Sequence, residues 1–278
     1  MSVTTTTSAS TISVSTPRGI SGKVYVRASA SGTAAPPIVY FHGVTGLLNE
    51  EPFLDALSTT HTVYAPEWPS FGVEETETSI EDMLDFTLHG ADLLTSLATM
   101  YGWTSAPIVI GNDMGAMIAA EMASVNPASM RHLVLLSPFG LWDGANPIPD
   151  IFSWLPFEFP EKLFHDVELG TRLLTSGLDF EDVKAIEAFQ IRNARQLGTA
   201  GKIMFPIPNR RLSKRLYRCD TPTVIAWGAQ DRLTITKPYS ELWQKSLPHA
   251  KTVVLENAGH MVHLEQPTEL AAKIRALI

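Results

Sequence analysis

One stretch, residues 108–123, restricts the possible folds of this chain more than any other. It begins with a β-branched run at 108–110, turns through Gly111-Asn112-Asp113-Met114-Gly115, and continues into helix-forming residues. Glycines two positions before and after Asp113 leave room for a sharp turn in which larger side chains would collide. The spacing therefore predicts a nucleophile elbow: a strand, a strained turn and a helix, with Asp113 exposed at its tip. Most elbows hold a serine there, whereas this chain holds an aspartate.

The length and composition are those of a globular protein with a large core. The chain has 278 residues, 45% hydrophobic and 18% charged, and no apolar run approaches the ~20 residues of a membrane-spanning helix. A net charge of −8 argues against nucleic acid or an anionic membrane as a partner. Cys219 is the single cysteine, which excludes an intrachain disulfide, and residues 1–10 lack the pattern of a signal peptide. We therefore expect a cytoplasmic monomer or homodimer.

Predicted strands and helices alternate along most of the chain. Continuous apolar runs predict strands buried on both faces at 38–41, 62–65, 107–110, 132–136, 223–226 and 252–255. Helical patterns occur at 50–58, 79–101, 114–125, 238–247 and 268–278. Alternating patterns at 11–15 and 23–28 predict an antiparallel hairpin at one edge of the sheet. Together they predict an α/β fold in which a mostly parallel sheet has helices on both faces.

The alternation is interrupted between residues 138 and 220. No buried strand is predicted in this segment, which is rich in Pro, Phe, Leu and Trp, and helices are expected around 160–164, 170–175, 181–193 and 209–217. So much apolar side-chain surface must cover something. We predict a helical lid at 139–219, inserted after the sixth strand over the carboxyl edge of a core domain formed by 1–138 and 220–278. A surface insertion without a role is the alternative.

Two later residues are candidates for completing a catalytic group with Asp113. Asp231 follows the predicted strand at 223–226 and His260 follows the one at 252–255, so both are expected at the carboxyl edge of the sheet. A nucleophile needs a base that moves protons, and the base needs a partner that orients it and stabilises its charged form. His260 is the candidate base and Asp231 its partner.

These motifs resemble the α/β-hydrolase fold superfamily from end to end. The order Asp113, Asp231, His260 is the nucleophile, acid, histidine order of that superfamily. The resemblance implies an oxyanion hole formed by the backbone N–H groups of Val44 and Met114, and it implies no metal or organic cofactor. The matching segments are His42-Gly43, the elbow, Gly228-x-x-Asp231, Gly259-His260 and Glu265-Gln266-Pro267.

Within the superfamily, an aspartate at the elbow resembles epoxide hydrolases and haloalkane dehalogenases. Their carboxylate attacks carbon to form an ester, which water activated by the histidine then hydrolyses. The supporting residues differ here: dehalogenases carry a tryptophan where this chain has Met114, and epoxide hydrolases use lid tyrosines, of which the lid holds only Tyr217. Candidates for hydrogen bonds to a leaving group are Trp68, Trp142, Trp154 and His165.

Three functional hypotheses remain open. In the first, Asp113 is a covalent nucleophile and His260 activates water, acting on a small apolar substrate such as an epoxide or alkyl halide. In the second, Asp113 is a natural or engineered replacement of the serine in an esterase, lactonase or carbon–carbon-bond hydrolase, with altered or lost activity. The third is a ligand-binding module without turnover.

Overall fold

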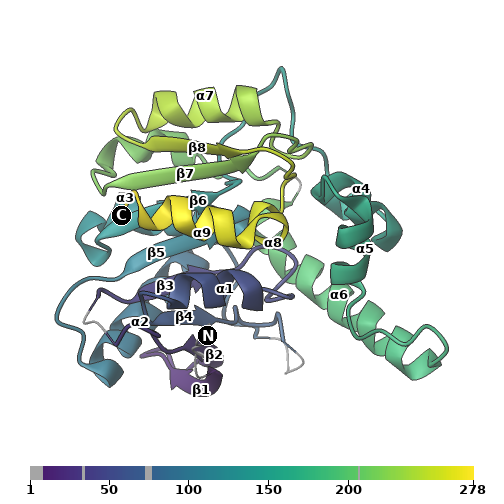
Figure 1. Cartoon of the computed structure of the whole chain (residues 1–278), viewed down its shortest axis with the longest axis horizontal. Helices are drawn as coiled ribbons and strands as arrows, with labels where there is room; N and C mark the ends of the chain where they lie inside the picture. Colours follow the sequence, from purple (N-terminus) through teal and green to yellow (C-terminus); the bar gives the residue numbers. More distant parts are fainter. Residues whose placement is uncertain (1–8, 33–34, 73–76, 206) are drawn as a thin grey trace, which may run out of the picture.

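The computed structural model describes residues 9–32, 35–72, 77–205 and 207–278, and these form an eight-stranded sheet with flanking helices (Figure 1). The strands are β1 (Ala9–Ser15), β2 (Ser21–Arg27), β3 (Ile38–Phe41), β4 (Val63–Pro66), β5 (Ile108–Asn112), β6 (His132–Leu136), β7 (Thr223–Gly228) and β8 (Lys251–Leu255). Their order in the sheet is β1-β2-β4-β3-β5-β6-β7-β8. β1, β2 and β4 pair antiparallel, and the pairings from β4 to β8 are parallel. The predicted edge hairpin and mostly parallel sheet are thus confirmed.

Helices cover both faces of this sheet, as the alternation predicted. α1 (Glu51–Ser58), α8 (Val262–Glu265) and α9 (Pro267–Arg275) bury their apolar side chains on one face. α2 (Met83–Tyr101), α3 (Asp113–Val125) and α7 (Thr236–Ser246) do so on the other. The central strands β3 and β5 are buried along their whole length, which explains their continuous apolar runs.

The β6–β7 insertion, residues 137–222, projects from one side of the molecule (Figure 1). It contains α4 (Phe159–Leu163), α5 (Val167–Leu174), α6 (Val183–Met204) and the short 3₁₀ turns η2 (Ile151–Ser153), η3 (Pro156–Glu158), η4 (Leu212–Lys214) and η5 (Leu216–Arg218). It contacts the loop after β3, where Asn49 donates a hydrogen bond to the Leu173 carbonyl in α5 (2.8 Å), and it contacts α8, where Glu265 accepts from the His165 N–H (2.8 Å). The insertion therefore lies beside two segments that follow parallel strands.

Two predicted elements were wrong. The helix expected at 209–217 is replaced by η4 and η5, because Arg211 has a left-handed backbone (φ 62°) that does not continue into an α-helix. β8 is not buried on both faces, because it is the last strand of the sheet and only Leu255 in it is fully buried. Its apolar run reflects packing on one face.

Candidate active site

The turn between β5 and α3 has the strained geometry that its glycines predict. Asp113 has a left-handed backbone with φ of 40°, which a non-glycine residue rarely adopts. A Cβ atom on Gly111 would lie 2.5 Å from the Gly115 carbonyl oxygen, and one on Gly115 would clash with the Phe41 carbonyl oxygen in β3. Both glycines are therefore required for the strand, turn and helix to pack this closely.

Asp113 is buried, which corrects the expectation that its carboxylate is exposed. Its side chain has no solvent-accessible surface, because the loop that follows β3 passes directly over it. A Cβ atom on Gly43 would clash with the Asp113 carboxylate, so only glycine permits this approach. The sequence motif predicts the direction of the side chain out of the turn but not the loop that covers it.

The Asp113 carboxylate accepts hydrogen bonds from both expected oxyanion-hole residues. The Val44 N–H lies 3.0 Å from Oδ1 and 3.2 Å from Oδ2, and the Met114 N–H donates to Oδ1. Oδ1 thus occupies the position between two backbone donors, and Oδ2 faces His260, whose Nε2 is 4.0 Å away. The two carboxylate oxygens therefore have different surroundings.

His260 and Asp231 form a buried pair next to Asp113. His260 Nδ1 lies 2.9 Å from Asp231 Oδ2, and neither side chain of the pair is exposed. Asp231 also accepts from the Thr234 hydroxyl (2.8 Å) and from the N–H groups of Leu233 (2.8 Å) and Thr234 (2.9 Å). This set of donors fixes the carboxylate, which in turn orients the imidazole so that Nε2 is directed at Asp113.

Burial and charge shift the pKa values of these groups. Burial raises the pKa of Asp113 to about 6, although His260 and the two backbone donors act in the opposite direction. Burial also acts to lower the pKa of His260, but the charge and hydrogen bond of Asp231 outweigh it and raise that pKa. At pH 7 a carboxyl with a pKa of about 6 is roughly nine-tenths ionised. Asp113 is then mainly an anion, beside a histidine that Asp231 makes a better proton acceptor.

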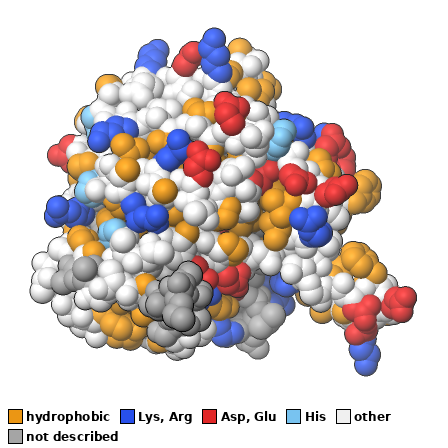
Figure 2. All heavy atoms as spheres, viewed as in Figure 1, with side chains coloured by type: hydrophobic (Ala, Val, Ile, Leu, Met, Phe, Trp, Pro, Cys, Tyr) orange, Lys and Arg blue, Asp and Glu red, His pale blue; other side chains and the backbone are white. Residues whose placement is uncertain are grey.

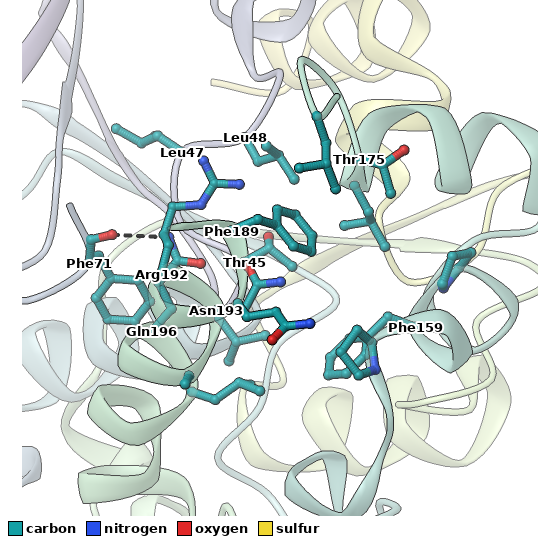
Figure 3. Close-up of a pocket in the computed structure, with 18 of the residues that line it drawn as sticks. Thr45, Leu47, Leu48, Phe71, Phe159, Thr175, Phe189, Arg192, Asn193 and Gln196 are labelled. Carbon is teal, nitrogen blue, oxygen red and sulfur yellow. Dashed lines mark hydrogen bonds between the residues drawn. The ribbon is translucent and has the colours of Figure 1, made fainter. Parts of the chain in front are cut away.

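A cavity of about 880 Å³ lies between the insertion and the loop after β3 (Figure 3). One face of α6 contributes Phe189, Arg192, Asn193 and Gln196, which recur at helical spacing, and Val44 is also part of the wall. Gln196 donates to the Phe71 carbonyl (3.0 Å), a contact drawn as the dashed line in Figure 3. Asp113 and His260 are not among the residues that line this cavity. Val44 is therefore the residue that belongs to both regions.

The four candidate leaving-group donors lie in different places. Trp154 lines the cavity. Trp68 is 1% exposed in the core, where its indole N–H donates to the His42 carbonyl (3.2 Å), so it does not line the cavity. Trp142 packs against the same core outside the cavity lining, and His165 is exposed at the start of the segment leading to α5. The structure therefore brings only Trp154 of these four to the cavity.

Two sets of residues in and around the candidate site were not predicted from the sequence. Thr234 supports Asp231, and its position three residues later on the same loop was a usable signal. The cavity face of α6 was missed because the helix was predicted to end at residue 193, whereas it continues to Met204. The recurrence of Phe189, Asn193 and Gln196 at helical spacing would have indicated that face.

Among the described residues, no group of three or more His, Cys, Asp or Glu side chains is placed to hold a metal ion. Within the same parts of the chain, no helix is both long and apolar enough to cross a membrane. On the face in Figure 2, acidic and basic side chains are interspersed over the core, and the insertion adds hydrophobic side chains.

The family model described as the alpha/beta hydrolase family matches residues 38–273. The chain is 24% identical to a dihydrolipoyllysine-residue acetyltransferase component of the acetoin cleaving system of Cupriavidus necator, covering 91% of this chain and 66% of that protein, just under two thirds of its length. It is also 24% identical to lipase 1 of Psychrobacter immobilis, covering 92% of this chain and 81% of that protein.

Solved structures with this fold include a membrane phospholipase A (TM-score 0.73, 20% identity, 97% of this chain and 85% of that one). A meta-cleavage product hydrolase is similar as well (TM-score 0.73, 15% identity, 96% of this chain and 97% of that one). At these identities the structural likeness shows the fold alone, and the family match covers most of the sequence. The chain belongs to the α/β-hydrolase family.

Proposed function

We propose that this hydrolase uses Asp113 as a covalent nucleophile on a small apolar substrate, an epoxide or an alkyl halide. The observation that supports this most strongly is the orientation of the Asp113 carboxylate. Oδ1 accepts from the Val44 and Met114 N–H groups, while Oδ2 faces His260 and is farther from the Val44 N–H than Oδ1 is, at 3.2 Å against 3.0 Å. An attacking carboxylate needs one oxygen directed away from the oxyanion hole, and the ester that it forms needs a hole that binds its carbonyl oxygen.

In the first step, Asp113 Oδ2 attacks the electrophilic carbon as the carbon–halogen or carbon–oxygen bond breaks. The leaving group departs as a halide ion or as an alkoxide, which takes its proton from water. Trp154 is the proposed hydrogen-bond donor to this group, because it is the candidate that lines the cavity. No base is needed here, since the carboxylate is already ionised at neutral pH.

In the second step, His260 removes a proton from water, and the resulting hydroxide adds to the carboxyl carbon of Asp113. The Val44 and Met114 N–H groups stabilise the negative oxygen of the tetrahedral intermediate. Asp231 stabilises the positive charge on His260 through the 2.9 Å contact. As the intermediate collapses, His260 returns its proton to the departing oxygen, which leaves as the alcohol, and the carboxylic acid that forms then loses a proton to regenerate the Asp113 carboxylate.

The β6–β7 insertion is the proposed lid over this site, which would make residues 139–219 the part that selects the substrate. The cavity beneath it includes Phe71, Phe159 and Phe189, so an apolar substrate body is expected there. Because Asp113 is fully buried, substrate entry requires movement of the loop after β3 or of the insertion.

The first test uses the His260→Gln variant with styrene oxide and with 1-bromohexane. Alkylation of Asp113 should proceed and hydrolysis should stop, so intact-mass spectrometry should show an adduct on the peptide that carries Asp113. The Asp113→Ala/His260→Gln variant is the matched control and should show none. An unmodified His260→Gln protein with both probes would argue against the proposal.

A single turnover of the unmodified enzyme in heavy-oxygen water follows the oxygen atoms. If Asp113 attacks carbon, the first alcohol released carries ordinary oxygen, and the heavy isotope appears in the peptide that holds Asp113. Heavy oxygen in the first alcohol, with none in that peptide, would mean that water attacks the substrate directly.

The second candidate is an esterase, lactonase or carbon–carbon-bond hydrolase in which Asp113 replaces serine. The lipase relative favours it, as does Met114 at the position of the halide-binding tryptophan. Tyr217, the single tyrosine of the lid segment, is 82% exposed and does not line the cavity. Attack of Asp113 on an ester would give a high-energy anhydride, and the Asp113 carboxylate itself occupies the oxyanion hole. The covalent mechanism therefore predicts slow ester hydrolysis, and rapid hydrolysis of p-nitrophenyl acetate would support the second candidate.

A further inference from the structure

A second buried pair of ionisable side chains lies next to the catalytic group. Glu50, the residue before α1, is 3% exposed, and the side chain of His263 in α8 has no exposed surface. His263 Nε2 lies 3.0 Å from Glu50 Oε2 and 3.2 Å from Oε1. The proposed reaction uses neither residue.

The pair joins the two segments that carry catalytic groups. Glu50 is at the end of the loop that begins with Gly43 and carries Val44, and His263 follows His260 by three residues. The preceding residue, Asn49, is held from the other side by its hydrogen bond to the insertion at Leu173 (2.8 Å). The end of the loop is therefore fixed to the histidine segment as well as to the insertion.

The charges of the pair also reach Asp113. Burial, followed by the carboxylates of Glu50 and Asp113, raises the pKa of Tyr40, a fully buried residue of β3 whose ring centre is 6.1 Å from that of His263. His263 is also one of the groups that act to lower the pKa of Asp113, against the larger effect of burial. His263 is therefore close enough to Asp113 for its charge to affect that carboxyl group.

Core packing alone does not account for such a pair. Burying two ionisable side chains is unfavourable, and apolar side chains of similar volume often give equal or greater stability. A hydrogen-bonded pair differs from an apolar contact in being directional, so it fixes the relative position of two segments as well as their proximity. In this case the segments lie 213 positions apart in the sequence.

We propose that Glu50 and His263 are positioning residues that hold the loop bearing the Val44 N–H in register with His260 and Asp113. They act through Val44: when the pair is broken, this N–H no longer holds Asp113 Oδ1. The expected change in alkylation rate rests on the proposed function. The expected effect on the position of the Val44 N–H rests on the geometry alone.

The variants are Glu50→Gln, His263→Gln, and the double apolar replacement Glu50→Met/His263→Leu. The matched control is Glu121→Gln. Glu121 in α3 is also a buried carboxylate, and it accepts a hydrogen bond from Arg215 Nε (2.7 Å) outside the catalytic group. Each variant is also made in the His260→Gln background, in which alkylation by 1-bromohexane is followed as a single step.

The saturating rate constant of alkylation should fall by about tenfold to a hundredfold in all three pair variants, because small displacements of reacting groups reduce rates by this order. The probe concentration at half saturation should change by less than about twofold, because neither residue lines the cavity. The double apolar variant should recover the thermal stability lost by the single variants and still alkylate slowly. Glu121→Gln should lose stability without slowing alkylation.

Recovery of both stability and alkylation rate in the double apolar variant would overturn the proposal, because the pair would then only fill space. So would a Glu50→Gln rate equal to that of the control.

Amide hydrogen exchange at Val44, measured by NMR without any substrate, separates this inference from the proposed function. Exchange at Val44 should be at least about tenfold faster in Glu50→Gln than in Glu121→Gln at matched stability. If the unmodified site never alkylates but Val44 exchange still depends on Glu50, the proposed function fails and the positioning role stands. Equal exchange in the two variants contradicts the positioning role whatever the reaction.

Discussion

The catalytic group and the cavity differ in how they are built. Asp113, Asp231 and His260 have 5% exposure or less and are joined to each other or to backbone donors by short polar contacts. The cavity wall is made largely of the insertion, and some of the side chains that line it remain exposed, with Phe157 at 75% and Phe180 at 67%. One region is tightly packed and polar, and the other is open and apolar.

Under the proposed function, this difference would separate the residues that react from those that select the substrate. The core holds the proposed nucleophile Asp113, the proposed base His260 and the backbone N–H groups proposed as the oxyanion hole, all in segments that follow strands of the sheet. The insertion meets the core through contacts such as Gln196 to Phe71 and Asn49 to Leu173, and the side chains that it contributes to the cavity are separate from Asp113, Asp231 and His260. Changes in the core should therefore alter rate constants, and changes in the insertion should alter selectivity.

The largest effect is expected from Asp113→Ala. If the reaction depends on this carboxylate, turnover of 1-bromohexane should fall by about 10⁴-fold or more while the circular dichroism spectrum stays unchanged. Removing a buried carboxylate with a raised pKa takes away an unfavourable group, so folding should not suffer. Measurable turnover in this variant would contradict the proposal that the Asp113 carboxylate carries out the reaction.

A smaller loss is expected from Asp231→Asn than from His260→Gln. Asp231 orients and stabilises the imidazole without taking part in bond changes, so its variant should retain about tenfold to a hundredfold more activity. The comparison is made on adduct hydrolysis after rapid mixing with 1-bromohexane. Equal losses would mean that the imidazole is inactive without its partner.

Asp113→Asn should increase stability in a pH-dependent way. Because the folded-state pKa of Asp113 is raised from 3.8 to about 6, the folded state binds more protons than the unfolded state between these values. The native protein therefore loses stability as pH rises from about 4 to 6, and the neutral variant does not. The difference should reach about 1–3 kcal/mol at pH 7 and vanish near pH 3, measured by urea unfolding.

The smallest effect is expected in the insertion, from Phe159→Ala. Phe159 lines the cavity and meets Trp154 edge to face at 5.5 Å, so its loss should change the relative kcat/KM for hexyl and butyl bromide by roughly tenfold. Phe205→Ala is the matched control, because Phe205 meets Phe152 at 5.7 Å in the same way but does not line the cavity. Equal effects of the two variants would show that the cavity does not select the substrate.

The sequence by itself determined the fold class and the positions of Asp113, Asp231 and His260 at strand ends. Each of these depends on short-range features: apolar runs for buried strands, glycines around Asp113, and loops that follow β7 and β8. Where a local pattern had two explanations, as at β8, the sequence alone could not distinguish an edge strand from a central one.

Only the tertiary structure decided what surrounds these residues. The burial of Asp113 depends on the loop at Gly43, and the partner of His263 is Glu50, far away in the sequence. The placement of Trp154 in the cavity and of Trp68 in the core likewise follows from how distant segments pack. The physical reason is that side-chain environment, and with it pKa and accessibility, is set by contacts between segments that no local pattern encodes.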